Sequence, residues 1–141
     1  MAPGDHIAFY GTLMSEAPPL PGAPSLSGLV TVVGPCVLAG ALHDLGSYPA
    51  LAPGAGRVAG ELCRIVSPDA LAILDAWEDY VADDEDGSEY VRRRVTLLQP
   101  AGTAWTYEFN RPQARLPVID GGDWIAHVRD RGTVEDAARR S

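Results

Sequence analysis

A carboxylate among apolar residues, near the end of an expected helix, is the feature of this chain best suited to chemistry. An apolar stripe recurs at helical spacing and consists of Ala70, Leu71, Ile73, Leu74 and Trp77. Glu78 follows Leu74 by four residues and Leu71 by seven, so in a regular helix it projects between them. A carboxyl group partly removed from water keeps its proton to higher pH, as an acid–base catalyst requires. The alternative is a polar residue at a fraying helix end, with its carboxylate in solvent.

The residues before this stripe are typical of a helix start. Ser67 can cap the helix, Pro68 suits its first turn, and Asp69 suits the positive end of the helix dipole. The sequence therefore predicts a helix over residues 67–78.

A second candidate feature lies in the backbone after the first expected strand, residues 6–10. Gly11 and Thr12 end this strand in a turn between Tyr10 and Leu13, where successive amide groups could point at an anion. An ordinary turn with no ligand is the alternative.

Other reactive side chains form no recognisable constellation. Cys36 and Cys63 fall within strand-like runs and are expected to be buried free thiols in a reducing compartment. His6, His43 and His127 are scattered without metal-ligand spacing. The chain has no Gly-x-Ser-x-Gly elbow and no phosphate-binding fingerprint. We therefore expect no metal site and no nucleophile of the Ser or Cys type.

The formal net charge is −8, and the excess acid is concentrated in one segment. Eight acidic residues follow one another with no base between them: Asp75, Glu78, Asp79, Asp83, Asp84, Glu85, Asp86 and Glu89. The other eleven acids balance eleven arginines, so no basic face is expected and nucleic-acid binding is disfavoured. The run 83–87 resembles a calcium loop but lacks the alternating ligands and closing Glu, which favours a solvated acidic loop.

The length of 141 residues suits a single domain over 1–141, with a frayed polar tail at about 132–141. No apolar run approaches the roughly 18 residues of a membrane span. The first residues lack the pattern of a signal peptide, so a cytoplasmic protein without membrane contact is expected.

Many short strands and one substantial helix indicate the architecture. The expected strands are residues 6–10, 29–33, 36–42, 57–66, 90–98 and 103–109, with the last two forming a hairpin around 100–102. Residues 34–35 are expected to form a turn or bulge, 46–56 to hold turns, and the Pro-rich segment 16–27 to be a surface loop. A short helix is expected over 122–131. The fold class is therefore α+β, with a small closed or strongly curved mixed β-barrel, one main helix and short flanking helices.

Residues 58–65 alternate, with Val58, Gly60, Leu62 and Arg64 on one face and Ala59, Glu61, Cys63 and Ile65 on the other. Arg92, Arg93 and Arg94 alternate across a later strand. For these arginines we expect exposed salt bridges, or for one of them a pairing with the acidic loop.

Six short motifs occur in an order that resembles the γ-glutamylcyclotransferase-like family. They are residues 10–13, 46–51, 58–62, 74–78, 90–92 and 122–124. The resemblance extends from Tyr10 to about Val128. This family includes γ-glutamylamine cyclotransferases, the deprotecting cyclotransferase of butirosin biosynthesis and AIG2-like proteins.

The resemblance implies a compact barrel with a pocket at one end and no metal or organic cofactor. It implies that the backbone amides of Tyr10 to Leu13 hold the α-carboxylate of a γ-glutamyl group, and that Glu78 is the catalytic acid–base. It places Tyr90 near the pocket, with Tyr107 as a further wall residue. The chain departs from the family in its acidic segment, its Pro-rich loop and Asp79, which stands where Gly is common.

The implied reaction is intramolecular aminolysis of a small γ-glutamyl compound, giving 5-oxoproline and a free amine or amino acid. The implied alternatives are a non-catalytic carboxylate-binding relative and hydrolysis of the same bond by water. The substrate's identity, and a role in primary metabolism or in biosynthetic deprotection, both stay open. A monomer or a weak homodimer fits the sequence equally well.

Overall fold

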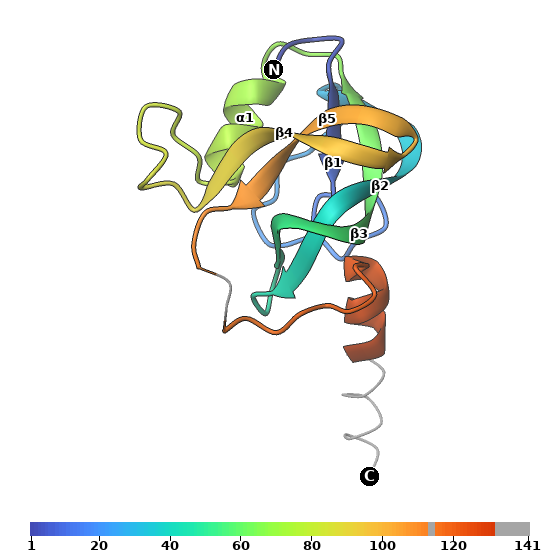
Figure 1. Ribbon diagram of the computed structural model, residues 1–141. Coiled ribbons are helices and arrows are strands. Elements are labelled where there is room, and N and C mark those ends of the chain that lie inside the picture. The colour runs from blue at the N-terminus through green and yellow to red at the C-terminus, as the bar shows by residue number, and fades with distance from the viewer. Residues whose placement is uncertain (113–114, 132–141) are drawn as a thin grey trace.

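Five strands close into a barrel in the computed structural model, which describes residues 1–112 and 115–131 (Figure 1). They are β1 (His6–Phe9), β2 (Val30–Asp44), β3 (Pro49–Ile65), β4 (Tyr90–Gln99) and β5 (Ala101–Phe109). Their order around the barrel is β1-β3-β2-β4-β5, and all neighbours are antiparallel except β1 and β5. The parallel pair closes the barrel where Ile7 faces Trp105. The expected closed mixed barrel is confirmed.

The two longest strands, β2 and β3, correct two sequence-based expectations. Residues 30–33 and 36–42 belong to one continuous strand, and the expected bulge is a register shift between Val32 and Gly34. Most of the segment 46–56 is not a turn, because β3 already begins at Pro49, opposite Asp44. Residues 49–56 have a low intrinsic strand propensity, but pairing with β2 satisfies their backbone hydrogen bonds.

The barrel interior is apolar and closely packed. Fully buried side chains include Ile7, Leu38, Leu42, Leu51, Val58 and Leu74. Burying each such side chain contributes about 1.5–3 kcal/mol to folding. On β3 the alternation is only partly kept, because Leu62 and Cys63 are both buried although they point to opposite faces. The segment 12–27 covers the Cys63 side. Burial raises the pKa of Cys36 to about 11 and that of Cys63 to about 12, so both are unreactive thiols, as expected.

The main helix, α1 (Ala70–Trp77), begins later than predicted. Asp69 occupies the N-cap position without a side-chain capping bond, while Ser67 Oγ accepts the Asp69 N–H at 3.1 Å. Ala70 and Leu74 are buried, but Ile73 is 37% exposed. The apolar stripe is therefore narrower than its sequence spacing indicated.

The C-terminal part of the described chain is helical over residues 124–131 and lies well away from α1 (Figure 1). Asp123 Oδ1 caps it by accepting the Ala126 N–H at 3.0 Å, and Trp124 is buried. Gly122 has a φ of +62°, and a Cβ there would lie 2.1 Å from the Arg57 carbonyl oxygen. Only glycine therefore allows this close approach to β3. The expected tail at 132–141 lies outside the described residues. Within the described residues no helix is long and apolar enough to span a membrane.

Candidate functional site

A cavity of about 250 Å³ opens where the end of β1, the end of α1 and the segment entering β4 meet. Every site residue expected from the sequence lines it: Tyr10, Gly11, Thr12, Leu13, Glu78, Tyr90 and Tyr107. The remaining wall residues are Ala8, Phe9, Leu20, Tyr48, Pro49, Trp77, Glu89 and Thr106. Leu20 comes from the Pro-rich loop and Glu89 from the acidic segment, so the two segments that depart from the family pattern both border the cavity.

A defined C-terminal motif of α1 fixes the position of Glu78. Tyr80 N–H donates to the Asp75 carbonyl at 2.9 Å, and Asp79 N–H donates to the Ala76 carbonyl at 3.3 Å. These two bonds form a Schellman motif, in which the residue after the helix cap adopts left-handed backbone angles. Asp79 has a φ of +54°, and it is the non-glycine residue with positive φ in the described chain. The helix end is therefore closed around Glu78, which contradicts the alternative of a fraying end in solvent.

The carboxyl group of Glu78 has no hydrogen-bond partner among residues 1–112 and 115–131. Burial, and then the negative charge of Glu89, raise its pKa from 4.5 to about 8. At neutral pH this group is mostly protonated, and it can exchange its proton near the pH at which amines also titrate. That property suits an acid–base catalyst.

The turn from Gly11 to Leu13 presents unused amide groups to the same cavity. No backbone carbonyl in the described part of the chain accepts a hydrogen bond from Gly11, Thr12 or Leu13, whereas the Gly11 carbonyl accepts the Met14 N–H at 3.1 Å. A Cβ on Gly11 would lie 2.8 Å from Pro49 Cγ, so glycine is needed for this close contact. Adjacent free amides of this kind can bind an anion such as a carboxylate.

The three tyrosines line the walls with their rings, while their hydroxyl groups are engaged within the protein. Tyr10 Oη donates to the Tyr107 carbonyl at 2.5 Å, and Tyr90 Oη donates to the Pro49 carbonyl at 2.8 Å. Tyr107 Oη donates to Asp75 Oδ1 at 2.6 Å. Burial raises the pKa of all three hydroxyls, so they stay protonated. They therefore hold the cavity in shape, which is the anchoring role of buried tyrosine hydroxyls.

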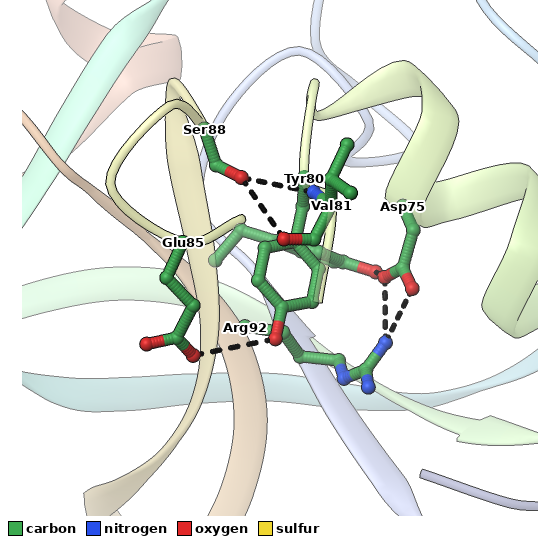
Figure 2. Close-up of polar contacts among 7 residues, drawn as sticks. Asp75, Tyr80, Val81, Glu85, Ser88 and Arg92 are labelled. Carbon is green, nitrogen blue, oxygen red and sulfur yellow. Dashed lines mark hydrogen bonds and ion pairs between the residues drawn. The ribbon is translucent and has the colours of Figure 1, made fainter. Parts of the chain in front are cut away.

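An ion pair beneath the cavity corrects the expectation for Arg92. Its Nη1 lies 2.6 Å from Asp75 Oδ2 and 2.7 Å from Asp75 Oδ1, and the two side chains are only 14% and 19% exposed (Figure 2). Arg92 is therefore not exposed: it pairs with Asp75 of α1, and its guanidinium carbon lies 5.2 Å from the centre of the Tyr80 ring. Asp75 connects β4 to the Tyr107 hydroxyl, so the pair supports a wall of the cavity. Local spacing could not reveal this contact, because it joins residues 17 positions apart.

The acidic segment from Asp79 to Glu89 is a loop whose residues 81–87 are exposed, as expected, and whose two ends are joined. Its ends meet where Glu89 N–H donates to the Asp79 carbonyl at 3.1 Å. Ser88, which is 1% exposed, holds the centre through bonds with the Val81 backbone, as Figure 2 shows. Asn110 Nδ2 donates to the Glu85 and Ser88 carbonyls. The loop therefore places Glu89 in the cavity wall at a fixed position.

Metal-ligating residues do not gather at the cavity. Within the described residues no group of three or more His, Cys, Asp or Glu side chains is arranged to hold a metal ion. His127 Nε2 instead lies 2.8 Å from Asp44 Oδ2, outside the cavity.

Comparisons with known proteins agree with this arrangement. Residues 7–126 match the family described as "Gamma-glutamyl cyclotransferase, AIG2-like". The "Gamma-glutamylcyclotransferase family protein YtfP" of Escherichia coli K12 is 40% identical over 84 residues, which cover 60% of this chain and 66% of that protein.

Two solved structures share the fold. The solution structure of YtfP from Escherichia coli superposes with a TM-score of 0.61 at 31% identity, covering 85% of this chain and 96% of that one. The crystal structure of PH0828 from Pyrococcus horikoshii gives a TM-score of 0.67 at 21% identity, covering 92% and 96% of the two chains. The second likeness bears on the fold alone.

Proposed function

Because the chain belongs to the gamma-glutamyl cyclotransferase, AIG2-like family, we propose that it converts a small γ-glutamyl compound into 5-oxoproline and a free amine or amino acid. One observation carries the proposal: the Glu78 carboxyl, unpartnered and with a pKa raised to about 8, lines the same cavity as the free amides of Gly11 to Leu13.

The substrate supplies its own nucleophile in this reaction. Its α-amino nitrogen attacks its γ-carbonyl carbon, the new C–N bond closes a five-membered ring, and the amide bond to the leaving nitrogen breaks. Holding the two reacting groups together supplies an effective molarity on the order of 10⁵ M or more. No Ser or Cys nucleophile is required, which agrees with the high pKa values of Cys36 and Cys63.

Glu78 manages the proton. The α-amine is mostly ammonium at neutral pH, and it must lose a proton before it can attack. Glu78 as carboxylate removes this proton, and as carboxylic acid it delivers one to the leaving nitrogen. Atoms balance without added water: the attacking nitrogen loses one proton before the attack and a second as it becomes the ring amide, and both leave on the product amine as its ammonium ion.

The backbone of the β1 exit turn positions the substrate. The amides of Gly11, Thr12 and Leu13 hold the α-carboxylate by hydrogen bonds that are roughly twice as strong as neutral ones. The rings of Tyr10, Tyr90 and Tyr107 close the apolar sides of the cavity. Their hydroxyls stay bonded to the protein and take no part in proton transfer.

The identity of the product tests this proposal. The purified protein is incubated with γ-glutamyl amines and γ-glutamyl dipeptides, and 5-oxoproline and glutamate are quantified by mass spectrometry. We expect 5-oxoproline with an equimolar amount of the released amine. Release of glutamate would identify hydrolysis by water, and binding without any product would identify a carboxylate-binding relative; either result overturns the proposal.

A further inference from the structure

The motif over residues 58–62 contains a carboxylate that the proposed reaction does not use. Glu61 lies on β3, where its backbone is paired with Phe9 of β1 on one side and with Pro35 of β2 on the other. Its side chain lines a second cavity, of about 420 Å³, beneath the segment 12–27, and it does not line the first. Glu61 therefore does not touch a substrate held in the first cavity, and a role in the reaction must pass through another part of the chain.

The Glu61 carboxylate is bonded to the chain just after the β1 exit turn. Ser15 N–H donates to Glu61 Oε1 at 2.9 Å, and the Ser15 hydroxyl donates to the same oxygen at 2.8 Å. Hydrogen bonds to a carboxylate are roughly twice as strong as those between neutral groups. Among residues 1–112 and 115–131, these two bonds are the ones that join residues 11–25 to a strand, since the other bonds of that segment stay within the loop.

Glu61 thus holds the chain on both sides of the turn. Its backbone pairs with Phe9, two residues before Gly11, and its side chain binds Ser15, two residues after Leu13. The span between these two attachments contains the three free amides that face the first cavity. Thr12 and Leu13 line both cavities, so the turn is a wall between them and Glu61 lies on the side away from the substrate.

A carboxylate is bound by several amides only while they point at one place. Ordering a loop at the moment of binding costs free energy, so a turn that is already held binds an anion more tightly than a mobile one. Without the Glu61 side chain, Ser15 N–H loses its acceptor and the chain after Leu13 loses its attachment to β3. Glu78 would stay in place, because it is held by the end of α1.

We propose that Glu61 is a positioning residue, which holds the Gly11–Leu13 amides in the arrangement that binds the α-carboxylate of the substrate. This inference rests on the proposed function, because it gives that turn a carboxylate to bind. It assigns the 58–62 motif a role in substrate binding, exerted through Ser15 and without contact to the reacting atoms.

Steady-state kinetics on γ-glutamyl-butylamine measure this role. Glu61→Ala should raise KM about tenfold and change kcat by no more than a few-fold, because the α-carboxylate is bound equally before and during the reaction. Glu61→Gln keeps an oxygen for both Ser15 groups but makes weaker bonds, so its KM should stay within about threefold of the unaltered protein. Ser15→Ala loses only the hydroxyl bond, and its KM should lie between those of the unaltered protein and Glu61→Ala.

An analogue without the α-carboxylate separates positioning from a general loss of structure. In 4-aminobutanoyl-butylamine a hydrogen replaces that carboxylate, so the turn has nothing to bind, and Glu61→Ala should leave its affinity unchanged. Glu16→Ala is the matched control, because Glu16 is exposed in the same loop and lies outside both cavity linings. An equal loss on the two compounds, or a Glu16→Ala effect as large as that of Glu61→Ala, would overturn the inference.

Binding distinguishes this inference from the proposed function. Affinities of the two compounds are measured by NMR on Glu78→Gln and on Glu78→Gln combined with Glu61→Ala, from the amide signals of Gly11, Thr12 and Leu13. If the unaltered protein forms no product, but only γ-glutamyl-butylamine binds more weakly without Glu61, the inference holds and the proposed reaction fails. If product forms but neither affinity depends on Glu61, the reaction holds and the inference fails. Absence of binding at the turn amides overturns both.

Discussion

Two regions of the molecule each remove a carboxylate from water: the cavity, and the docking site, where the helix of residues 124–131 contacts Asp44. Only the docking site gives its carboxylate partners of opposite charge. At the docking site Asp44 Oδ2 lies 2.8 Å from His127 Nε2 and 3.6 Å from Arg131 Nη1, while its Oδ1 accepts the Gly46 N–H at 2.6 Å. Burial acts to raise the pKa of Asp44, yet these partners outweigh it and the pKa is lowered. In the cavity Glu78 has no such partner, and its pKa rises to about 8.

The difference distinguishes a structural carboxylate from a reactive one. Asp44 is satisfied by the fold, so its charge stabilises the attachment of residues 124–131. Glu78 is held in place through its backbone, by the hydrogen bond of its N–H to the Leu74 carbonyl and by the Schellman motif, and its carboxyl group stays free for a ligand. The same contrast occurs within one helical turn, since Asp75 is fully engaged by Arg92 and Tyr107. Burial therefore raises the pKa of a carboxyl group and leaves it open to a ligand only where such partners are missing.

The largest expected effect is on turnover. Glu78→Gln should fold normally and lose about a hundred-fold or more in kcat, the scale of acid–base assistance. Glu108→Gln is the control, because Glu108 is also a half-buried carboxyl with a raised pKa but lies outside the cavity lining. It should retain activity within a few-fold in the 5-oxoproline assay. A Glu78→Gln enzyme with nearly unaltered turnover would remove Glu78 from the mechanism.

The next largest effect is on stability: the same substitution, Glu78→Gln, should make the protein more stable at alkaline pH. The folded-state pKa of Glu78 lies above its unfolded value of 4.5, so the stability it contributes is present below pH 4.5 and is lost as pH rises through about 8. Glu78→Gln should therefore raise the free energy of unfolding at pH 9 by about 2 kcal/mol, because partial water access reduces the full cost of burying the charge. At pH 4 the two proteins should be equal in urea unfolding. A variant less stable than wild type at pH 9 would contradict the unpartnered state of this carboxyl.

Asp44→Asn should lower the free energy of unfolding, by a smaller amount than Glu78→Gln raises it. The folded-state pKa of Asp44 lies below its unfolded value, so its stabilisation is present above that value and is lost as pH falls through the folded pKa. We expect a loss of about 1 kcal/mol at pH 7, the scale of a hydrogen bond between protein groups. At acidic pH, where wild-type Asp44 is protonated, the difference should vanish. Catalysis should be unaffected, and a drop in turnover comparable to that of Glu78→Gln would remove the contrast between the two regions.

The smallest effect concerns the residue that closes α1. Asp79 adopts a left-handed φ of +54°, which glycine reaches without strain. Asp79→Gly should stabilise the protein by about 0.5 kcal/mol, because relief of strain exceeds the added chain entropy. Thermal unfolding gives the sign. Turnover should not change, and a variant that both melts earlier and loses activity would show that the Asp79 side chain itself supports the site.

The barrel was predictable because its signals are local. Alternation marks β3, the Pro100–Gly102 turn marks the last hairpin, and Gly34 marks the bulge. The strand nature of residues 49–56 was not predictable, because the partner strand β2 overrides the preferences of Pro and Gly. For the same reason Ile73 matched the apolar stripe of α1 but lies exposed, since spacing does not show how wide the covered face is.

The candidate site was predictable in its members but not in its interactions. Motif order brought Tyr10, Glu78 and Tyr90 together, and the structure places them in one cavity. The pairing of Arg92 with Asp75 and the position of Glu89 depend on how the acidic loop closes, which is a tertiary property. Two features of the sequence could have indicated that Glu89 lines the cavity: Tyr48 in the 46–51 motif, and the run of acidic residues that ends at Glu89.

Titration of Glu78 shows whether its carboxyl group is buried without a partner. Carbon-13 labelling of the glutamate carboxyls allows each to be followed by NMR against pH, and Glu78→Gln assigns the resonance. We expect a midpoint near pH 8 for Glu78 in the ligand-free protein, well above the value of about 4.3 for an unperturbed glutamate. A midpoint between pH 4 and 5 would contradict it, because a carboxyl that ionises as it does in water is not held unpartnered in this cavity.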